Sequence, residues 1–326
     1  MSGPFAGTRV LLVDVENDPT GHAGLRKRAL ERLGCVVATS DLREKKGLLS
    51  RWRGGSSQER LGKAVLQHQA QLVLVVEGAE LTAGMITSLK RDSDAVWAAW
   101  FIGETRSLPL MEALSVAYDV LLVPGTDLVE QLRGASRPPT IHLPPGCDPS
   151  VHRPMKARDQ FRANVVFVGA ATPRREQLLA ELTGFGLAIW GPGWRRTPLK
   201  DYCRGEMLDL DDYVRAYAGA SVAVNIHREG NSQGGTVTGC NQRLFELAAI
   251  GVPQVVDNRA DLPLAFDTGR ELLTFGTGSE LRLLVQELLQ DPTTADRLAQ
   301  AGRRRALAEH TYMHRLGAIL GVTRST

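Results

Sequence analysis

Apolar and polar positions along the chain alternate between short apolar runs and longer amphipathic stretches. The run TRVLLVD at 8–14 precedes a stretch at 23–34 in which Leu25, Ala29 and Leu33 recur with the spacing of one helix face. Further apolar runs, each near a stretch of helical pattern, occupy 35–41, 71–78, 95–103, 118–125 and 140–144. Continuous apolar runs between helices are typical of a parallel sheet covered on both faces. The first half of the chain therefore predicts a doubly wound α/β domain.

A proline-rich segment ends this first series. The segment LPPGCDPSVHRPMKARDQ at 143–160 contains four prolines and no periodic pattern, which predicts an interdomain linker. We place the boundary between an N-terminal domain at 1–148 and a C-terminal domain at 149–326. The last helix is a candidate to cross back to the first domain.

The second half repeats the α/β pattern. Strands are predicted at 164–170, 187–193, 221–229, 252–258 and 271–276, and helices at 173–186, 210–220, 241–251 and 279–290, with two more near the C-terminus. The predicted architecture is thus two Rossmann-like halves, whose strand ends offer ligand sites.

Composition narrows the possible functions. The 326 residues suffice for two cores, and 43% apolar with 23% charged residues is typical of a soluble globular protein. The net charge of +3 comes without a basic block interleaved with aromatics, so no nucleic acid is expected as a partner. Four widely spaced cysteines with no CxxC argue against a zinc site and indicate a reducing cytosol. No apolar stretch reaches the roughly 18 residues of a membrane span, and we expect a cytoplasmic protein.

Acidic residues follow the first apolar run. Asp14, Glu16 and Asp18 at this position suggest the receiver domain of a response regulator, where carboxylates hold Mg²⁺. A receiver needs an aspartate at the end of its third strand, but Glu77, one methylene longer, lies just beyond that strand here. We therefore interpret the acidic residues as a polar loop after the first strand.

The stretch 221–258 is the most informative. An apolar run ends at His227 and Arg228, a glycine-rich loop follows, and a helix begins near Asn241. A helix N-terminus attracts anions, and glycines let the backbone approach them closely.

Two charged residues share one face of that helix. Arg243 and Glu246 are three residues apart, and Arg binds a diphosphate bidentately while a carboxylate accepts ribose hydroxyls. An ordinary ion pair on a solvated helix face is the alternative. The adjacent glycine loop favours a nucleotide diphosphate site.

Several stretches resemble a known family in order and spacing. They lie at 164–182, 189–196, 217–229, 241–258, 269–281 and 309–315. Together they are similar to the C-terminal half of the CgeB-like (spore maturation protein) glycosyltransferases. These belong to the GT-B group, related to glycosyltransferase families 1 and 4. The resemblance covers roughly 95–320 and implies a GT-B fold: two Rossmann-like, doubly wound domains facing a central cleft.

The resemblance implies roles for individual residues. Glu246 corresponds to the carboxylate that binds the donor ribose, and Arg243 to its companion in the R-x-F-E pattern. Asn241 opens the same helix, and Gly169 corresponds to backbone close to the donor phosphates. Residues implied at the border of the base or near the phosphates and sugar are Trp190, Gly191, Gly193, His227 and Arg228. Trp190 can equally be a core aromatic, and His227 a satisfied buried histidine.

The chain also departs from its relatives. Thr238 stands where family 4 enzymes carry a second glutamate, and 101–104 replaces a D-D-P-like acidic stretch. Glu104 is a candidate for the missing acid or a surface residue. His22, after the first strand, is a candidate base or a capping residue.

The resulting hypothesis is a metal-independent, retaining glycosyltransferase of the hexosyltransferase type, with no cofactor. Its donor is a nucleotide-diphosphate sugar, UDP-sugar by default. Its acceptor, which the fold family binds with the N-terminal domain, is an unidentified glycan, lipid, peptide or small molecule. A non-catalytic nucleotide-sugar-binding module and a nucleotide-sugar 2-epimerase remain as alternatives.

Overall fold

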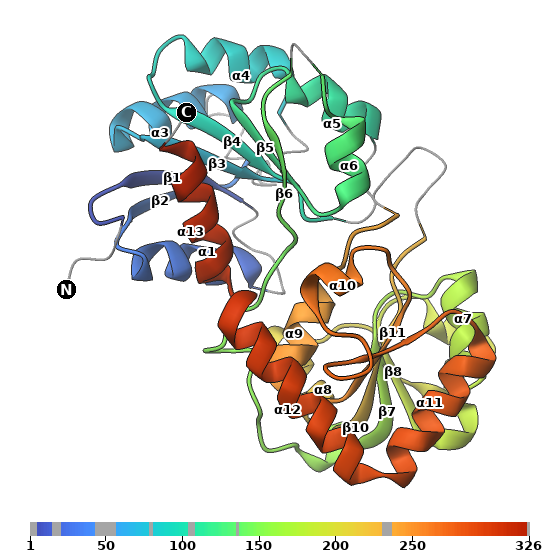
Figure 1. Cartoon of the computed structure of the whole chain (residues 1–326). Helices are drawn as coiled ribbons and strands as arrows, with labels where there is room; N and C mark the ends of the chain where they lie inside the picture. The colour runs from blue at the N-terminus through green and yellow to red at the C-terminus, as the bar shows by residue number, and fades with distance from the viewer. Residues whose placement is uncertain are drawn as a thin grey trace, which may run out of the picture. The chain divides into compact units, whose positions relative to one another are not determined.

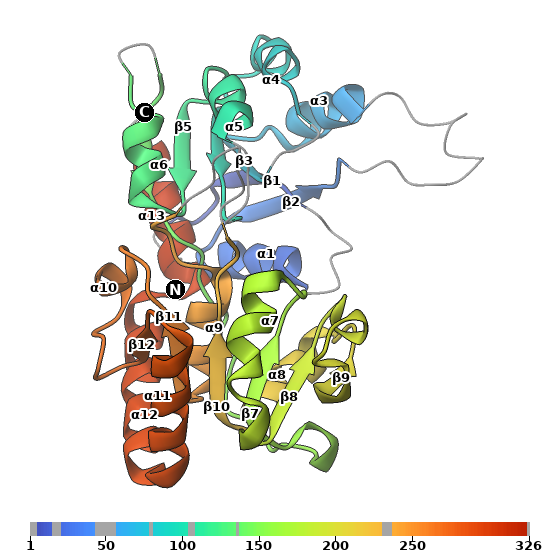
Figure 2. The ribbon, with the colours of Figure 1, turned by 90° about the vertical axis from the view of Figure 1, so that its right-hand side faces the viewer.

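The computed structural model describes residues 5–14, 21–42, 57–77, 81–103, 108–134, 137–229 and 237–324 (Figures 1 and 2). The chain forms two compact units. Unit 1 comprises Met1–Pro144, Gly230–Val237 and Tyr312–Thr326, and unit 2 comprises Pro145–Glu229 and Thr238–Thr311. The first change of unit, between Pro144 and Pro145, falls inside the segment predicted as a linker.

Unit 1 is built on a parallel sheet. Over the described residues, six strands lie in the order β2-β1-β3-β4-β5-β6. They are β1 (Arg9–Val13), β2 (Val36–Ser40), β3 (Leu72–Val76), β4 (Val96–Trp100), β5 (Val120–Val123) and β6 (Thr140–His142). Because β2 and β3 lie on opposite sides of β1, the strand order reverses between β1 and β3.

Helices cover both faces of this sheet (Figure 2). They are α1 (His22–Arg32), α3 (Ser57–His68), α4 (Ala83–Lys90), α5 (Leu108–Ser115), α6 (Thr126–Gln131) and α13 (Tyr312–Thr323). Alternate strand residues such as Leu11 and Val73 join the core with Leu61 of α3 and Ile86 of α4. α3 lies between the apolar runs at 35–41 and 71–78, and the sequence pattern there is weak because only Leu61 and Val65 of this helix are buried.

The last helix, α13, packs in unit 1. It contacts α1, the Tyr312 and Trp100 rings meet edge to face at 6.4 Å, and Arg315 Nε donates to Pro144 O at 2.9 Å. Since α12 (Pro292–Glu309) lies in unit 2, the chain returns to unit 1 at its end.

The carboxylate at the end of β1 is part of a buried ion pair. Arg26 of α1 donates from Nε to Asp14 Oδ2 at 2.7 Å and from Nη2 to Oδ1 at 3.1 Å. Both side chains are about 5% exposed or less. Because Arg26 binds both carboxylate oxygens, Asp14 links β1 to α1. Glu16 and Asp18 lie outside the described residues.

Unit 2 has a second parallel sheet. Its six strands, again over the described part of the chain, lie in the order β12-β11-β10-β7-β8-β9. They are β7 (Ala163–Val168), β8 (Leu187–Trp190), β9 (Cys203–Gly205), β10 (Ala220–Asn225), β11 (Gln254–Asp257) and β12 (Leu273–Phe275). The short β9 was not predicted, because three half-exposed residues give no periodic signal. The prediction of two parallel α/β sheets is confirmed.

Two helical layers enclose this sheet (Figure 1). The helices are α7 (Pro173–Ala180), α8 (Leu210–Ala218), α9 (Gln242–Ile250), α10 (Leu262–Ala265), α11 (Gly278–Gln290) and α12, with 3₁₀ turns at Asp159–Phe161, Thr183–Phe185, Trp194–Arg196 and Lys200–Tyr202. Phe167 packs with α7 and α11, while Val166 packs with α8 and α9. Successive residues of a buried strand therefore serve opposite layers.

Candidate functional site

The two central strands of the unit 2 sheet define where a ligand is expected. β8 and β9 follow β7 on one side of it, whereas β10 pairs with β7 on its other side and is followed there by β11 and β12. Ligands of open α/β sheets bind at the carboxyl ends of strands where the order reverses in this manner. Gly169 follows β7, His227 and Arg228 follow β10, and α9 begins after them.

Glycines let the loops after β7 and β8 touch. Gly191 has φ +142°, and a Cβ there would lie 2.5 Å from the carbonyl carbon of Gly169. Gly169 N donates to Trp190 O at 2.8 Å, and Trp194 Nε1 donates to Gly169 O at 2.7 Å. Gly193, with φ +91°, opens the turn that places Trp194. The backbone at Gly169 is thereby held from two sides.

A buried arginine joins the ends of β7 and β10. Arg175 donates from Nε and Nη2 to Ile226 O at 3.2 and 2.6 Å, and from Nη1 to Ala170 O at 3.1 Å. It is 3% exposed. Arg175 therefore holds the carbonyls that follow two neighbouring strands.

His227 also makes its contacts inside unit 2. Its Nδ1 lies 2.6 Å from Asp257 Oδ1, and its Nε2 lies 3.1 Å from Asn241 N. Since a backbone N–H can only donate, Nε2 is the acceptor and Nδ1 carries the hydrogen. Both ring nitrogens of His227 are hydrogen-bonded and 1% of its surface is exposed, so the residue positions the start of α9. This is the environment of a satisfied buried histidine, the alternative to a contact with phosphate or sugar.

Asp257 anchors this arrangement. Burial alone would raise its pKa, but hydrogen bonds from the His227 ring and backbone N–H, with the charge of Arg174, hold the pKa far below its ordinary value. Arg174 Nη1 donates to Asp257 Oδ2 at 2.8 Å. The carboxylate therefore stays ionised and links α7, β11 and the residues after β10.

The first turn of α9 is capped from within. Asn241 Oδ1 accepts from Leu244 N at 3.0 Å, and the amides of Asn241 and Asn225 exchange hydrogen bonds at 2.9 and 3.0 Å. Both asparagines are buried. The Asn241 side chain thus serves to fix the helix start.

Arg243 lies in the same first turn and is half-buried. Its guanidinium carbon is 5.9 Å from the centroid of the Phe167 ring, while that of Arg175 is 5.3 Å from the same centroid. Phe167 is next to last in β7, so Arg243 brings positive charge to the strand end at which Gly169 lies.

Glu246 lies one helical turn further and is 3% exposed. Tyr213 of α8 donates its hydroxyl to Glu246 Oε2 at 2.6 Å, and His152 Nε2 lies 3.6 Å from Oε1. Sequence reasoning missed both partners. Tyr213 shares a helix face with Tyr217, which is a weak signal, and His152 lies in the non-periodic linker, which gives none.

Trp190 and Arg228 have different environments. Trp190 is 3% exposed and packs in the core against Phe161, with ring centroids 6.0 Å apart. This is the core position named as the alternative to a base contact. Arg228 is exposed, and its carbonyl accepts from Arg259 Nη2 at 2.9 Å.

In unit 1, His22 is the first residue of α1 and its Nδ1 lies 3.2 Å from the Tyr312 hydroxyl. Glu104 lies outside the described residues. A different carboxylate serves the neighbouring backbone: Glu77, with φ +64°, accepts from Ile102 N at 2.7 Å and Gly103 N at 2.6 Å. Sequence reasoning considered Glu77 only as part of a receiver.

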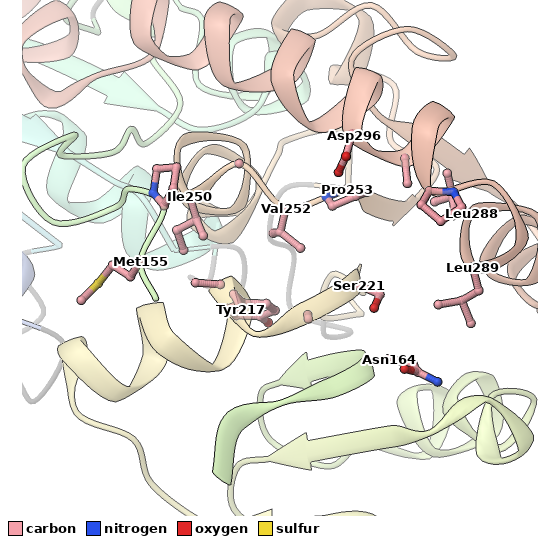
Figure 3. A pocket seen from close by; sticks show the side chains of 16 residues that line it. Met155, Asn164, Tyr217, Ser221, Ile250, Val252, Pro253, Leu288, Leu289 and Asp296 are labelled. Carbon is pink, nitrogen blue, oxygen red and sulfur yellow. The ribbon is translucent and has the colours of Figure 1, made fainter. Parts of the chain in front are cut away.

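The described part of unit 2 contains hollows on opposite sides of the sheet ends. One of about 450 Å³ is at the amino ends of the strands, lined by Asn164, Ser221, Tyr217 and Leu288 among others (Figure 3). Since sheet ligands bind at the carboxyl ends, this hollow is separate from the candidate site. Another, of about 560 Å³, is lined by Arg174 and residues that include Glu229 and Thr277, beside the candidate site.

The second half of the chain matches a known protein-family model. Residues 174–321 match a family model described as glycosyl transferase-like. The match includes α8, α9 and the strands from β8 onward. A search of curated protein sequences gives no match to this chain.

Solved structures match the whole chain in fold. Sucrose-phosphate synthase from Thermosynechococcus elongatus is 16% identical with a TM-score of 0.69, over 98% of this chain and 99% of that one. Anabaena HepE, in complex with UDP and glucose, is 12% identical with a TM-score of 0.66, over 98% and 100%. AviGT4, a glycosyltransferase of avilamycin A biosynthesis, is 14% identical with a TM-score of 0.64, over 97% and 96%.

The family match and the fold together define the class. The protein is a glycosyltransferase with the GT-B fold, as the resemblance implied. In the part of the chain that the structure describes, no helix is long and apolar enough to span a membrane. Nor do those residues bring three or more His, Cys, Asp or Glu side chains together as a metal site.

Proposed function

We propose that this protein transfers a hexose from a UDP-sugar to an acceptor, as an enzyme of the CgeB-like kind. The observation that carries the proposal is Arg243 in the first turn of α9, beside the end of β7 where the strand order reverses. A cation at this place meets an anionic ligand where the fold collects ligands.

Transfer breaks the bond between the sugar C1 and the departing diphosphate, so negative charge develops on phosphate oxygens. A fixed guanidinium and the N–H groups of a helix start stabilise that charge more in the transition state than in the ground state. Arg243 supplies the first, and the α9 start, held by His227 and Asn241, supplies the second. Gly169 and Gly191 keep the facing backbone free of side chains.

The nucleotide is inferred from relatives. HepE was solved with UDP and with UDP-glucose, and an α-glucosyltransferase was solved in complex with UDP and a 13-mer DNA. We extend UDP from those proteins to this chain, with Glu246 as the partner of the ribose hydroxyls.

The remaining features of the reaction are also proposed. Arg243 and the helix start supply charge stabilisation without a metal or cofactor, and the CgeB-like resemblance favours retention at C1. The acceptor is a glycan, lipid, peptide or small molecule. Four cysteines, all free thiols, support a cytoplasmic location.

The test is calorimetric titration of UDP, UDP-glucose and uridine into the wild type and Arg243→Ala. Arg282→Ala is the matched control, because Arg282 is exposed and lies over the Phe185 ring 5.5 Å away, on α11. Charge-assisted hydrogen bonds contribute about 1.5–3 kcal/mol, so Arg243→Ala should weaken UDP binding about 10- to 150-fold. Uridine binding should change little, as should all ligands with Arg282→Ala.

Equal losses for UDP and uridine would contradict the phosphate role of Arg243. Incubation with UDP-glucose then separates the classes of function. Release of UDP, faster with a suitable acceptor, indicates transfer. An epimerised UDP-sugar among the products would identify an epimerase, and binding with no turnover would identify a binding module.

A further inference from the structure

Glu246 is held between two side chains from separate segments, the partly buried Tyr213 and the buried His152. The Tyr213 hydroxyl lies 2.6 Å from Oε2, and His152 Nε2 lies 3.6 Å from Oε1. The Glu246 side chain is 4% exposed and that of His152 is fully buried. The carboxylate is thus almost fully enclosed, and its orientation depends on these two neighbours.

Each partner is itself fixed. The Tyr213 ring meets the Tyr217 ring edge to face at 5.1 Å, in the same helix. His152 Nδ1 lies 3.0 Å from Asp148 N, and Asp148 Oδ1 accepts from Ser150 N at 2.9 Å. Because the Asp148 N–H must donate, His152 Nδ1 is the acceptor, and the ring hydrogen is on Nε2, directed at Glu246.

The charge pattern supports a donor role for the phenol. Burial raises the pKa of Tyr213 well above its ordinary value, and the nearby charge of Glu246 raises it further. Tyr213 therefore keeps its hydrogen across the working pH range. Its hydroxyl therefore acts as a donor to Glu246 Oε2 and fixes the orientation of that carboxylate.

We propose that Tyr213 and His152 are positioning residues that orient the Glu246 carboxylate toward the ribose hydroxyls of the donor and so set the preference for a ribonucleotide over a 2′-deoxyribonucleotide. This inference rests on the proposed function, in which Glu246 binds the ribose. Neither residue touches the donor: each acts through Glu246.

The ratio of the affinities for UDP and 2′-deoxy-UDP isolates the contribution of the ribose contact. UDP and 2′-deoxy-UDP differ by one hydroxyl. Damage elsewhere in the site weakens the binding of both ligands and leaves the ratio of their dissociation constants unchanged. A site built to bind a hydroxyl rejects the analogue that lacks it, because its own polar group then loses a partner. We expect the wild type to prefer UDP.

Three variants and a control are measured by calorimetry. Tyr213→Phe removes only the hydroxyl, and His152→Asn keeps an acceptor near the Nδ1 position while removing the Nε2 donor. Tyr217→Phe is the control, because the Tyr217 hydroxyl accepts from the backbone N–H of Val168 at 3.0 Å instead of donating to Glu246. Glu246→Gln tests the ribose contact itself.

Tyr213→Phe and His152→Asn should each lower the preference for UDP about three- to tenfold, whereas Tyr217→Phe should leave it at the wild-type value. If Glu246→Gln abolishes the preference but the two positioning variants keep it, this inference is overturned and the proposed ribose contact stands. If Glu246→Gln keeps the preference, the ribose contact itself is wrong. If Tyr217→Phe changes the preference for UDP as much as Tyr213→Phe does, the effect comes from general packing, and the inference is overturned. Should Tyr213→Phe fail to fold, His152→Asn decides alone.

Discussion

Replacement of Gly191 by alanine tests whether the contact between two backbone loops builds the donor site. A Cβ at this position would lie 2.5 Å from the carbonyl carbon of Gly169, and nearer still to its oxygen. Carbon atoms in contact are normally about 3.5–4.0 Å apart, so one loop must move by roughly 1 Å. No side chain can rotate away to relieve this overlap, because both partners are backbone.

The cost has two sources. A non-glycine residue at φ +142° is strained by roughly 1–3 kcal/mol. Overpacking in a well-packed interior costs roughly 1–3 kcal/mol more. We therefore expect Gly191→Ala to lower the free energy of unfolding by about 2–6 kcal/mol, and a displacement of about 1 Å at Gly169 to lower turnover roughly 100-fold.

Denaturant unfolding gives the stability, and UDP titration gives donor affinity. Gly184→Ala is the control, because nothing lies within 4 Å of a Cβ placed there. It should leave both quantities near the wild-type values. If Gly191→Ala retains wild-type stability and UDP affinity, the loops after β7 and β8 are not packed as described, and Gly169 does not border the donor.

Two further predictions concern buried carboxylates. The pKa of Asp257 is lower in the folded state than in the unfolded state, so its ionised carboxylate stabilises the fold. This contribution to the free energy of unfolding is complete above about pH 4, the ordinary pKa of Asp. It is lost as the pH falls toward the folded-state pKa, because the unfolded chain binds the proton first. Asp257→Asn should flatten the acid limb of the unfolding free energy against pH; an unchanged acid limb would show that another group controls it. Arg26→Met should lower the unfolding free energy by about 3–5 kcal/mol, since it leaves the buried Asp14 without its cation, and Asp14→Leu added to it should recover most of the loss. A single-variant loss below about 1 kcal/mol would argue against this buried pair.

Much of the fold follows from local pattern. Continuous apolar runs such as 71–78 and 221–229 predict buried parallel strands because a strand enclosed on both faces has no polar side. The segment 221–258 also predicts the helix start at Asn241, because the capping residue and the helix are neighbours in sequence. The short β9 and the helix α3 give too few repeats for such a signal.

What the sequence alone determined is therefore the class: two doubly wound halves, a glycine-rich strand end, and Arg243 with Glu246 on one helix. The tertiary structure decided the partners. His227 is bonded to Asp257, thirty residues away, and Glu246 to Tyr213, thirty-three residues away. Periodicity shows which face of an element is buried, but a hydrogen bond depends on which distant segment packs there, and that is set only when the layers assemble.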